Sequence, residues 1–229
     1  MSGSTLHRAN AASPFKGAAS VNPREQMMNQ ARIVAIATGT SNTLLVPSGG
    51  SEPPRRVMSG IRKAVVSTLD KPVALFCGAL GLEGDEQVDL TVHGGQEKAL
   101  YAYPTEHYEY WKTSLDAAEP FVNRFDHAGA VGENLATQGL TEQEVYLGDL
   151  WNIGEVTLQV TMPREPCFKF NAVTGDKQAS KKMADTGYCG WYLAVITPGI
   201  LKAGDTINVV PGSRHQTIHQ AFKQKLRRT

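Results

Sequence analysis

Cysteine is scarce in this chain: there are three in 229 residues, and none forms a Cys-X-X-Cys pair. This scarcity excludes a disulfide framework, a four-cysteine zinc site and an iron–sulfur cluster held by four thiolates. A few unpaired cysteines are typical of proteins that work in a reducing compartment, so we expect a cytoplasmic location.

Long apolar runs and an excess of charge are also absent. No apolar run approaches the roughly 20 residues that a membrane-spanning helix needs. The formal net charge is +1, so the overall charge favours neither nucleic acid nor a membrane surface as a partner. Hydrophobic residues make up 41% of the chain and charged residues 20%, which is typical of a globular protein that buries its own core.

The first 30 residues lack the continuous apolar core of a secretory signal, and Glu25 is their single acidic residue. Their richness in Ser, Ala and Asn predicts a disordered extension over residues 1–30, with an organellar transit peptide as the alternative. We expect one folded domain over residues 31–212, followed by a basic, solvated and helical tail over residues 213–229.

Short apolar runs separated by turn residues follow one another along the folded domain. Those that predict strands cover residues 32–37, 61–66, 73–76, 98–103, 131–139, 145–151, 156–162, 192–196 and 206–210. Helices are predicted over residues 104–115 and 179–186. Many short strands with few helices indicate a mainly-β fold, a closed or nearly closed β-barrel with a few peripheral helices. Cys77 ends one of the apolar runs and is assigned to the core.

Cys167 lies in a stretch with an unusual composition, between two prolines and two cations. Pro166 is suited to open a helix, which would place Cys167 in the first helical turn. A thiol at that position, near Arg164 and Lys169, would favour its thiolate, the form that attacks electrophiles and binds soft metals. The alternative is a small buried residue at a bend, and this stretch alone leaves both interpretations open.

His93 follows a run, residues 88–92, in which apolar and polar side chains alternate. A strand there would carry His93 to its end, directly before Gly94 and Gly95. Two glycines allow positive φ angles and let a ligand approach the backbone closely. A hairpin turn with His93 on its polar rim is the alternative interpretation.

Other polar residues are interpreted as solvent-exposed. Glu83, Asp85 and Glu86 lack the spacing of a calcium loop, so they are assigned to a solvated turn. His107 is assigned to the surface of a helix and not to a ligand site.

Four short segments, in this order and spacing, carry a resemblance that none of them carries alone: residues 81–87 (GLEGDEQ), 92–95 (VHGG), 132–135 (GENL) and 163–169 (PREPCFK). Together they resemble the MOSC domain, named for the C-terminal part of molybdenum-cofactor sulfurases, and in particular its stand-alone YiiM-like branch. The resemblance covers residues 32–211. It implies a β-barrel with a cleft that holds a molybdopterin cofactor and reduces N-hydroxylated purines and amidoximes. The family is also associated with pyridoxal phosphate binding.

The resemblance also implies roles for individual residues. Cys167 matches the invariant cysteine of the family and would be the thiolate ligand of molybdenum, a soft donor beside the dithiolene sulfurs. His93 is the candidate catalytic proton donor, because histidine titrates near neutral pH, and Asp89 is a weaker candidate. The remaining matched positions would line the cleft or bind the cofactor and its phosphate: Gly94, Gly95, Asn134, Arg164 and Lys169.

The resemblance also implies the expected partners. The substrate would be an N-hydroxylated small molecule, and a separate reductase would supply electrons, because no cysteine set for an iron–sulfur cluster and no nucleotide-binding fingerprint is found. A homodimer is one option for the assembly. Many YiiM-like proteins continue into a small three-helix domain, whereas residues 215–229 suffice for one helix, so contacts made by that domain are not carried over.

Three other functions remain open at this point. The first is a sulfur carrier that holds a persulfide on Cys167 for metal–sulfur assembly, because this role also needs an accessible thiolate. The second is a cysteine hydrolase that pairs Cys167 with His93 or His107. The third is a barrel that binds a phosphorylated ligand without catalysis.

Overall fold

The computed structural model describes residues 30–48, 52–88, 94–119 and 121–228. The expectations for residues 1–29, for Asp89 and for His93 lie outside these described residues. Within them, no helix is both long enough and apolar enough to cross a membrane.

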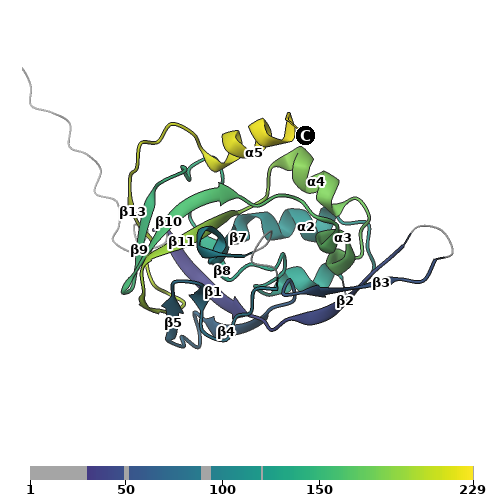
Figure 1. The fold of residues 1–229 in the computed structure, drawn as a ribbon, viewed down its shortest axis with the longest axis horizontal. Helices are drawn as coiled ribbons and strands as arrows, with labels where there is room; N and C mark the ends of the chain where they lie inside the picture. The colour runs from purple at the N-terminus through teal and green to yellow at the C-terminus, as the bar shows by residue number, and fades with distance from the viewer. Residues whose placement is uncertain (1–29, 49–51, 89–93, 120, 229) are drawn as a thin grey trace, which may run out of the picture.

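Eight strands form one curled sheet in the order β13-β9-β10-β11-β7-β8-β1-β4, a half-barrel wrapped around the core (Figure 1). Neighbouring strands pair antiparallel, except β7 and β8, which run parallel. The strands are β1 (Arg32–Thr38), β4 (Ala64–Thr68), β7 (Leu100–Pro104), β8 (Leu135–Gln138), β9 (Leu150–Ile153), β10 (Val156–Pro163), β11 (Trp191–Thr197) and β13 (Asn208–Val210). The mainly-β fold class is confirmed, with the sheet curled and ending at β13 and β4.

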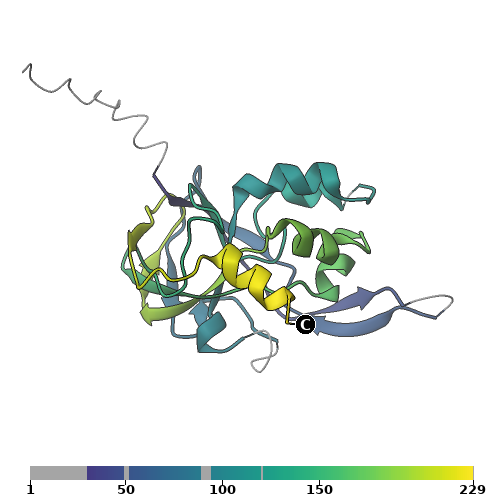
Figure 2. The same ribbon diagram turned by 90° about the horizontal axis from the view of Figure 1, so that it is seen from above.

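Two smaller sheets complete the β structure. One joins β5 (Leu75–Gly78), β6 (Gly81–Leu82) and β12 (Gly199–Leu201), and the other is a hairpin of β2 (Asn42–Val46) and β3 (Arg55–Ser59). The strands predicted at 61–66 and 73–76 begin two to three residues later in the structure. The hairpin was not predicted, because its strands lack a regular alternation of apolar and polar residues: Leu45 and Met58 are apolar but exposed. It projects from the body in both views (Figures 1 and 2).

In the described ranges, four helices and three short 3-10 turns lie outside the sheets. They are η1 (Gln96–Lys98), η2 (Thr105–His107), α2 (Tyr108–Ser114), η3 (Val122–Asp126), α3 (Phe168–Thr174), α4 (Ala179–Thr186) and α5 (Ile218–Leu226). The bounds of α4 match the prediction, because Gly187 ends the helix in the left-handed conformation, with φ of 82°.

Helix α5 confirms the helical prediction for the C-terminal region, but the helix is not simply solvated. Ile218 and Phe222 are buried. The Lys223 Nζ atom donates to the carbonyl oxygens of Ala184 and Asp185, at 2.8 and 2.7 Å, so it caps the end of α4. Figure 1 shows α5 beside α4. A basic composition predicted a solvent-facing surface and missed this docking.

Strand β10 leads directly to the candidate cysteine. Val156, Leu158 and Val160 are buried and alternate with partly exposed residues, as the period of a half-buried strand requires. The strand pairs with β9 on one side and β11 on the other. It ends at Pro163, as predicted, because proline has no N–H to donate to a neighbouring strand.

The core contains two of the three cysteines. Cys77 and Cys189 are fully buried, which confirms the assignment of Cys77. Burial raises the pKa of Cys77 to about 12 and raises that of Cys189 well above its ordinary value. Cys167 is only partly buried. The structure therefore leaves one thiol in a position to meet a ligand.

Candidate functional site

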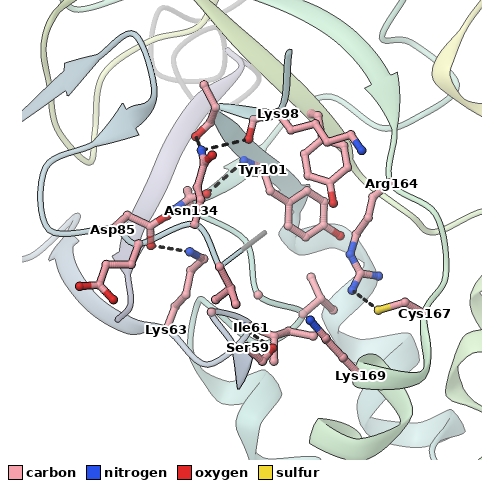
Figure 3. A pocket seen from close by; sticks show the side chains of 18 of the residues that line it. Ser59, Ile61, Lys63, Asp85, Lys98, Tyr101, Asn134, Arg164, Cys167 and Lys169 are labelled. Carbon is pink, nitrogen blue, oxygen red and sulfur yellow. Dashed lines mark hydrogen bonds and ion pairs between the residues drawn. The ribbon is translucent and has the colours of Figure 1, made fainter. Parts of the chain in front are cut away.

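A pocket opens beside the end of β10, and Cys167 and Arg164 form part of its wall (Figure 3). Tyr192 and five separate stretches line it, within residues 59–63, 85–88, 98–101, 131–134 and 164–169. Its empty space, which includes the open mouth, is about 720 Å³. The wall is therefore assembled from segments that lie far apart in the sequence.

Cys167 is the residue immediately before helix α3. Its backbone is extended, with φ of −143° and ψ of 156°, so it is the N-cap and not a member of the first turn as predicted. Its carbonyl oxygen accepts hydrogen bonds from the Phe170 N–H at 2.9 Å and from the Ser180 hydroxyl at 2.7 Å. Both hydrogen bonds are made by the backbone carbonyl of Cys167, and its sulfur atom is directed at the pocket (Figure 3).

Arg164 fills the wall beside the cysteine and is almost completely buried, with 5% of its surface exposed. Its Nη2 atom lies 3.9 Å from the Cys167 Sγ atom, and its Nη1 atom lies 3.3 Å from the Met183 Sδ atom. The rings of Tyr101 and Phe170 each lie 5.4 Å from the guanidinium carbon. The charge is therefore surrounded by soft, weakly accepting groups.

This guanidinium forms no ion pair with a carboxylate in the part of the chain that the structure describes. Burial acts to lower the pKa of Arg164, but the surrounding acidic groups, Tyr101 and Cys167 first, outweigh it and raise the pKa. The group thus stays charged. A buried charge without a partner is costly, so an anion at this wall, either the Cys167 thiolate or a bound ligand, would compensate it.

Two lysines extend the positive character of the pocket wall. Lys169, predicted to bind the cofactor phosphate, lines the pocket, and its Nζ atom donates to the Met58 carbonyl oxygen at 3.2 Å. The Nζ atom of Lys98 lies 5.7 Å from the centre of the Tyr192 ring. Both are positioned to contribute charge to an anionic ligand as point cations.

Acidic residues also line the pocket, but each is already engaged by the protein. Glu165 forms an ion pair with a lysine of α5, and Asp85 with Lys63. Glu86 is exposed and accepts a hydrogen bond from the Ser41 N–H at 2.8 Å. In the described wall, each of these acidic side chains thus has a partner in the protein, whereas Arg164 has no carboxylate partner.

Asn134 also lines the pocket, but its amide binds the protein itself. The Oδ1 atom accepts from the Tyr101 N–H at 3.1 Å, and the Nδ2 atom donates to the Ala37 carbonyl at 3.3 Å and to the Asp85 Oδ2 atom at 2.9 Å. The side chain thereby joins β1, β7 and the acidic turn. Its cofactor-binding role stays a prediction, and the geometry assigns it a structural one.

The assignment of the acidic turn to solvent is wrong for Asp85. The side chain is 7% exposed, and its Oδ1 atom accepts from the Gly39 N–H at 2.8 Å and from Lys63 Nζ at 2.5 Å. Glu83 and Glu86 are exposed, as expected. Among the described residues, no group of three His, Cys, Asp or Glu side chains is arranged to hold a metal ion.

Gln87, the last residue of the acidic turn, holds the segment that follows it. Its Oε1 atom accepts from the Gly95 N–H at 2.8 Å, and its Nε2 atom donates to the Leu80 carbonyl at 2.8 Å. Gly95 has a φ of 88°, the left-handed region that favours glycine. Neither Gly94 nor Gly95 is among the described residues that line the pocket.

His107 does not lie at the surface, which corrects the prediction. It is buried, its Nε2 atom lies 2.7 Å from the Glu142 Oε2 atom, and its ring stacks on Tyr188 with centres 3.7 Å apart. Glu142 comes from a distant segment, so no local pattern indicated the pairing. His107 is not among the residues that line the pocket with Cys167, so the geometry offers no support for a hydrolase pair of the two.

Glu133 was missed as a polar core residue. It is fully buried and accepts from the N–H groups of Gly129 and Val131, at 2.7 and 2.9 Å, and from the Tyr108 hydroxyl. Burial raises the pKa of Glu133. These contacts shape the loop that carries Asn134 into the pocket wall.

The fold, the cysteine at the pocket and the order of the motifs define a class of protein. The family model described as the MOSC domain matches residues 89–208, more than half of the chain. The chain belongs to the MOSC domain family.

Particular relatives sharpen this assignment. The chain is 44% identical to protein YiiM of Escherichia coli over 148 residues, which is 64% of each chain. It is 39% identical over 142 residues to a protein named Reductase from Gibberella moniliformis, a match that spans 62% of this chain and 24% of that protein. The crystal structure of YiiM from Geobacillus stearothermophilus superposes with a TM-score of 0.60 at 30% identity, over 84% of this chain and 82% of that one. The sequence matches thus span less than two thirds of the curated relatives.

Proposed function

We propose that this protein binds a molybdopterin-type molybdenum cofactor in the pocket and reduces N-hydroxylated small molecules, such as N-hydroxylated purines and amidoximes, with electrons from a separate reductase. The observation that carries the proposal is the pair of Cys167 and Arg164: an accessible thiol beside a buried cation that has no acidic partner among the described residues. The name Reductase of the fungal relative supports an oxidoreductase.

The residues present fit such a cofactor. The Cys167 sulfur is the soft donor that molybdenum requires, and Arg164 offers guanidinium donors next to it. Lys169 and Lys98 add cationic charge for a phosphate group.

When bound, the cofactor would supply the two-electron redox chemistry that no side chain of this pocket provides. The chain's own residues would hold and orient it: Cys167 by ligation, Arg164 by compensating the negative charge of the sulfur. The half-enclosed pocket would position the N–OH group of the substrate and exclude part of the bulk water.

The experiment is the molybdenum and pterin content of the purified protein, made in a host that synthesises the cofactor, beside the Cys167→Ser variant. Near-stoichiometric molybdenum with a pterin signal, strongly reduced in the variant, is the expected result. Wild-type protein without either would contradict the proposal and favour the second candidate, a persulfide carrier. That candidate is supported by the same accessible Cys167 beside Arg164 and would appear as a labile sulfur adduct on Cys167.

A further inference from the structure

We propose that Lys63 is the proton donor to the departing oxygen atom when the N–O bond of the substrate breaks. The inference rests on the proposed function and adds a catalytic residue that neither the sequence motifs nor the resemblance indicated. It follows from the placement of a buried ion pair in the same pocket as Cys167.

Lys63 lies between β3 and β4 and lines the pocket from the side opposite Arg164 and Cys167 (Figure 3). Its side chain is 6% exposed. In the described part of the chain, its Nζ atom has one hydrogen-bond partner, the Asp85 Oδ1 atom at 2.5 Å. An ammonium group has three donors, so two remain for the pocket.

Asp85 is fixed so firmly that it can hold the lysine charged inside the protein. Its carboxylate accepts from the Gly39 N–H at 2.8 Å and from the Asn134 Nδ2 atom at 2.9 Å, in addition to Lys63. All of its partners are hydrogen-bond donors, so the carboxylate is held in place from three sides. The negative charge in turn compensates the Lys63 ammonium where water is largely excluded.

The chemistry needs such a donor at this place. Reduction of an N–OH group to N–H and water consumes two electrons, supplied by the reductase, and two protons. The N–O bond breaks, the oxygen leaves with a bonding pair, and the Lys63 Nζ atom gives it a proton to form water. The nitrogen takes the second proton from solvent. An oxygen leaving as hydroxide is a far stronger base than an alkylamine, so the transfer from Lys63 is favourable.

After the transfer, the neutral amine of Lys63 takes a proton from water that enters through the open mouth of the pocket.

Two other hydroxyl groups in the pocket are poorer donors. The Tyr101 hydroxyl already donates to the Cys189 carbonyl oxygen at 2.8 Å, and burial raises its pKa. Burial also raises the pKa of Tyr192. Lys63 carries a positive charge, which neither tyrosine does, and the Tyr101 hydroxyl has no second proton to donate.

The test uses cofactor-loaded enzyme, reduced beforehand with dithionite, and follows a single turnover of benzamidoxime. Lys63→Ala and Lys63→Arg are compared with wild type and with Lys71→Met, a matched loss of an exposed lysine in the turn between β4 and β5. We expect the rate constant to fall by about 100-fold or more in Lys63→Ala. In Lys63→Arg it should fall by about tenfold or more, because arginine keeps the charge but is a weaker acid. Lys71→Met should match wild type.

A second readout separates proton donation from a structural role. Added ethylamine and weaker-base amines should restore the Lys63→Ala rate in an order that follows the pKa of the amine, with molybdenum content unchanged. A Lys63→Arg rate within threefold of wild type, or a Lys63→Ala rate that no amine restores, would overturn the assignment of Lys63 alone. A loaded wild-type enzyme that does not reduce benzamidoxime or an N-hydroxylated purine would overturn the proposed function, and the role of Lys63 with it.

Discussion

Arg164 and Glu133 are both buried charges in the same half of the molecule, but their surroundings differ. Glu133 accepts hydrogen bonds from two backbone N–H groups and the Tyr108 hydroxyl. Arg164 contacts two sulfur atoms and two aromatic rings and forms no ion pair with a carboxylate among the described residues. The first group is satisfied by strong donors of the protein itself, whereas the second has sulfur atoms, aromatic rings and the Tyr192 hydroxyl around it, but no carboxylate among the described residues.

The difference separates structural charges from functional ones. A satisfied buried carboxylate holds a loop in shape, and its loss leaves several donors without partners. A buried cation with weak partners adds little to stability and instead prepares a place for an anion. The contrast therefore supports the proposal that a ligand binds at the Arg164 and Cys167 end of the pocket.

The largest effect on stability is expected for Glu133→Ala. The substitution leaves the N–H groups of Gly129 and Val131 and the Tyr108 hydroxyl buried without an acceptor. At about 1–3 kcal/mol for each of the three donors, the free energy of unfolding should fall by roughly 3–9 kcal/mol. Urea denaturation measures it. Glu133→Gln, which keeps one acceptor oxygen, is the matched control and should lower the free energy of unfolding by less. A loss below about 1 kcal/mol for Glu133→Ala would contradict the proposed difference between Glu133 and Arg164.

A smaller effect on stability is expected for Arg164→Met. Methionine fills much of the space between Tyr101 and Phe170 and removes a charge that lacks an acidic partner, so the free energy of unfolding should change by less than about 2 kcal/mol. Cofactor affinity should instead fall about 10- to 100-fold, because the loss of one charge-assisted hydrogen bond corresponds to a change of this size. Denaturation and molybdenum content on the same preparations test both parts. Equal destabilisation by Arg164→Met and Glu133→Ala would contradict the comparison.

The smallest effect is a change in pH dependence at Asp176. Burial acts to raise the pKa of this carboxyl, but hydrogen bonds from Lys182 and from the N–H groups of Gln178 and Asp116 outweigh it and lower the pKa. A lowered pKa stabilises the fold above the ordinary value and loses that contribution as pH falls through the folded value. Asp176→Asn should therefore be less stable at neutral pH by about 1 kcal/mol and should flatten the curve below about pH 4.

Glu133 should change the pH dependence of the free energy of unfolding in the opposite direction, and the same denaturation curves measure both effects. Its pKa is raised, so its contribution is fully present below the ordinary value and is lost as pH rises through the folded value. Stability curves for Glu133→Gln and Asp176→Asn should diverge from wild type at opposite ends of the pH range. Parallel curves would mean that neither carboxylate is shifted as described.

The features predicted well from the sequence depend on local chemistry. Pro163 ends β10 and Gly187 ends α4, because each residue acts on its own backbone. The position of Cys167 was predicted within one residue by the neighbouring proline. The MOSC motifs then identified which cysteine faces the pocket, a conclusion that composition alone left open.

The features missed depend on partners that are far away in the chain. Asp85 was assigned to solvent because its partners, Lys63 and Asn134, lie 22 and 49 residues from it. His107 was assigned to the surface because Glu142 lies 35 residues further on. No periodicity reports such pairs, since hydrophobic patterns describe which face of an element is buried and not which polar groups meet there.

The pocket wall comes from five stretches spread between residues 59 and 169, and Tyr192 adds a sixth position. Two of the strands behind it, β7 and β8, run parallel and pair across an intervening segment that contains α2 and η3. Such a pairing has to close a long loop. A chain that is still emerging during synthesis therefore lacks part of the pocket wall until Tyr192 has been made, and a ligand that binds the complete wall meets a chain that already includes β7, β8 and β11.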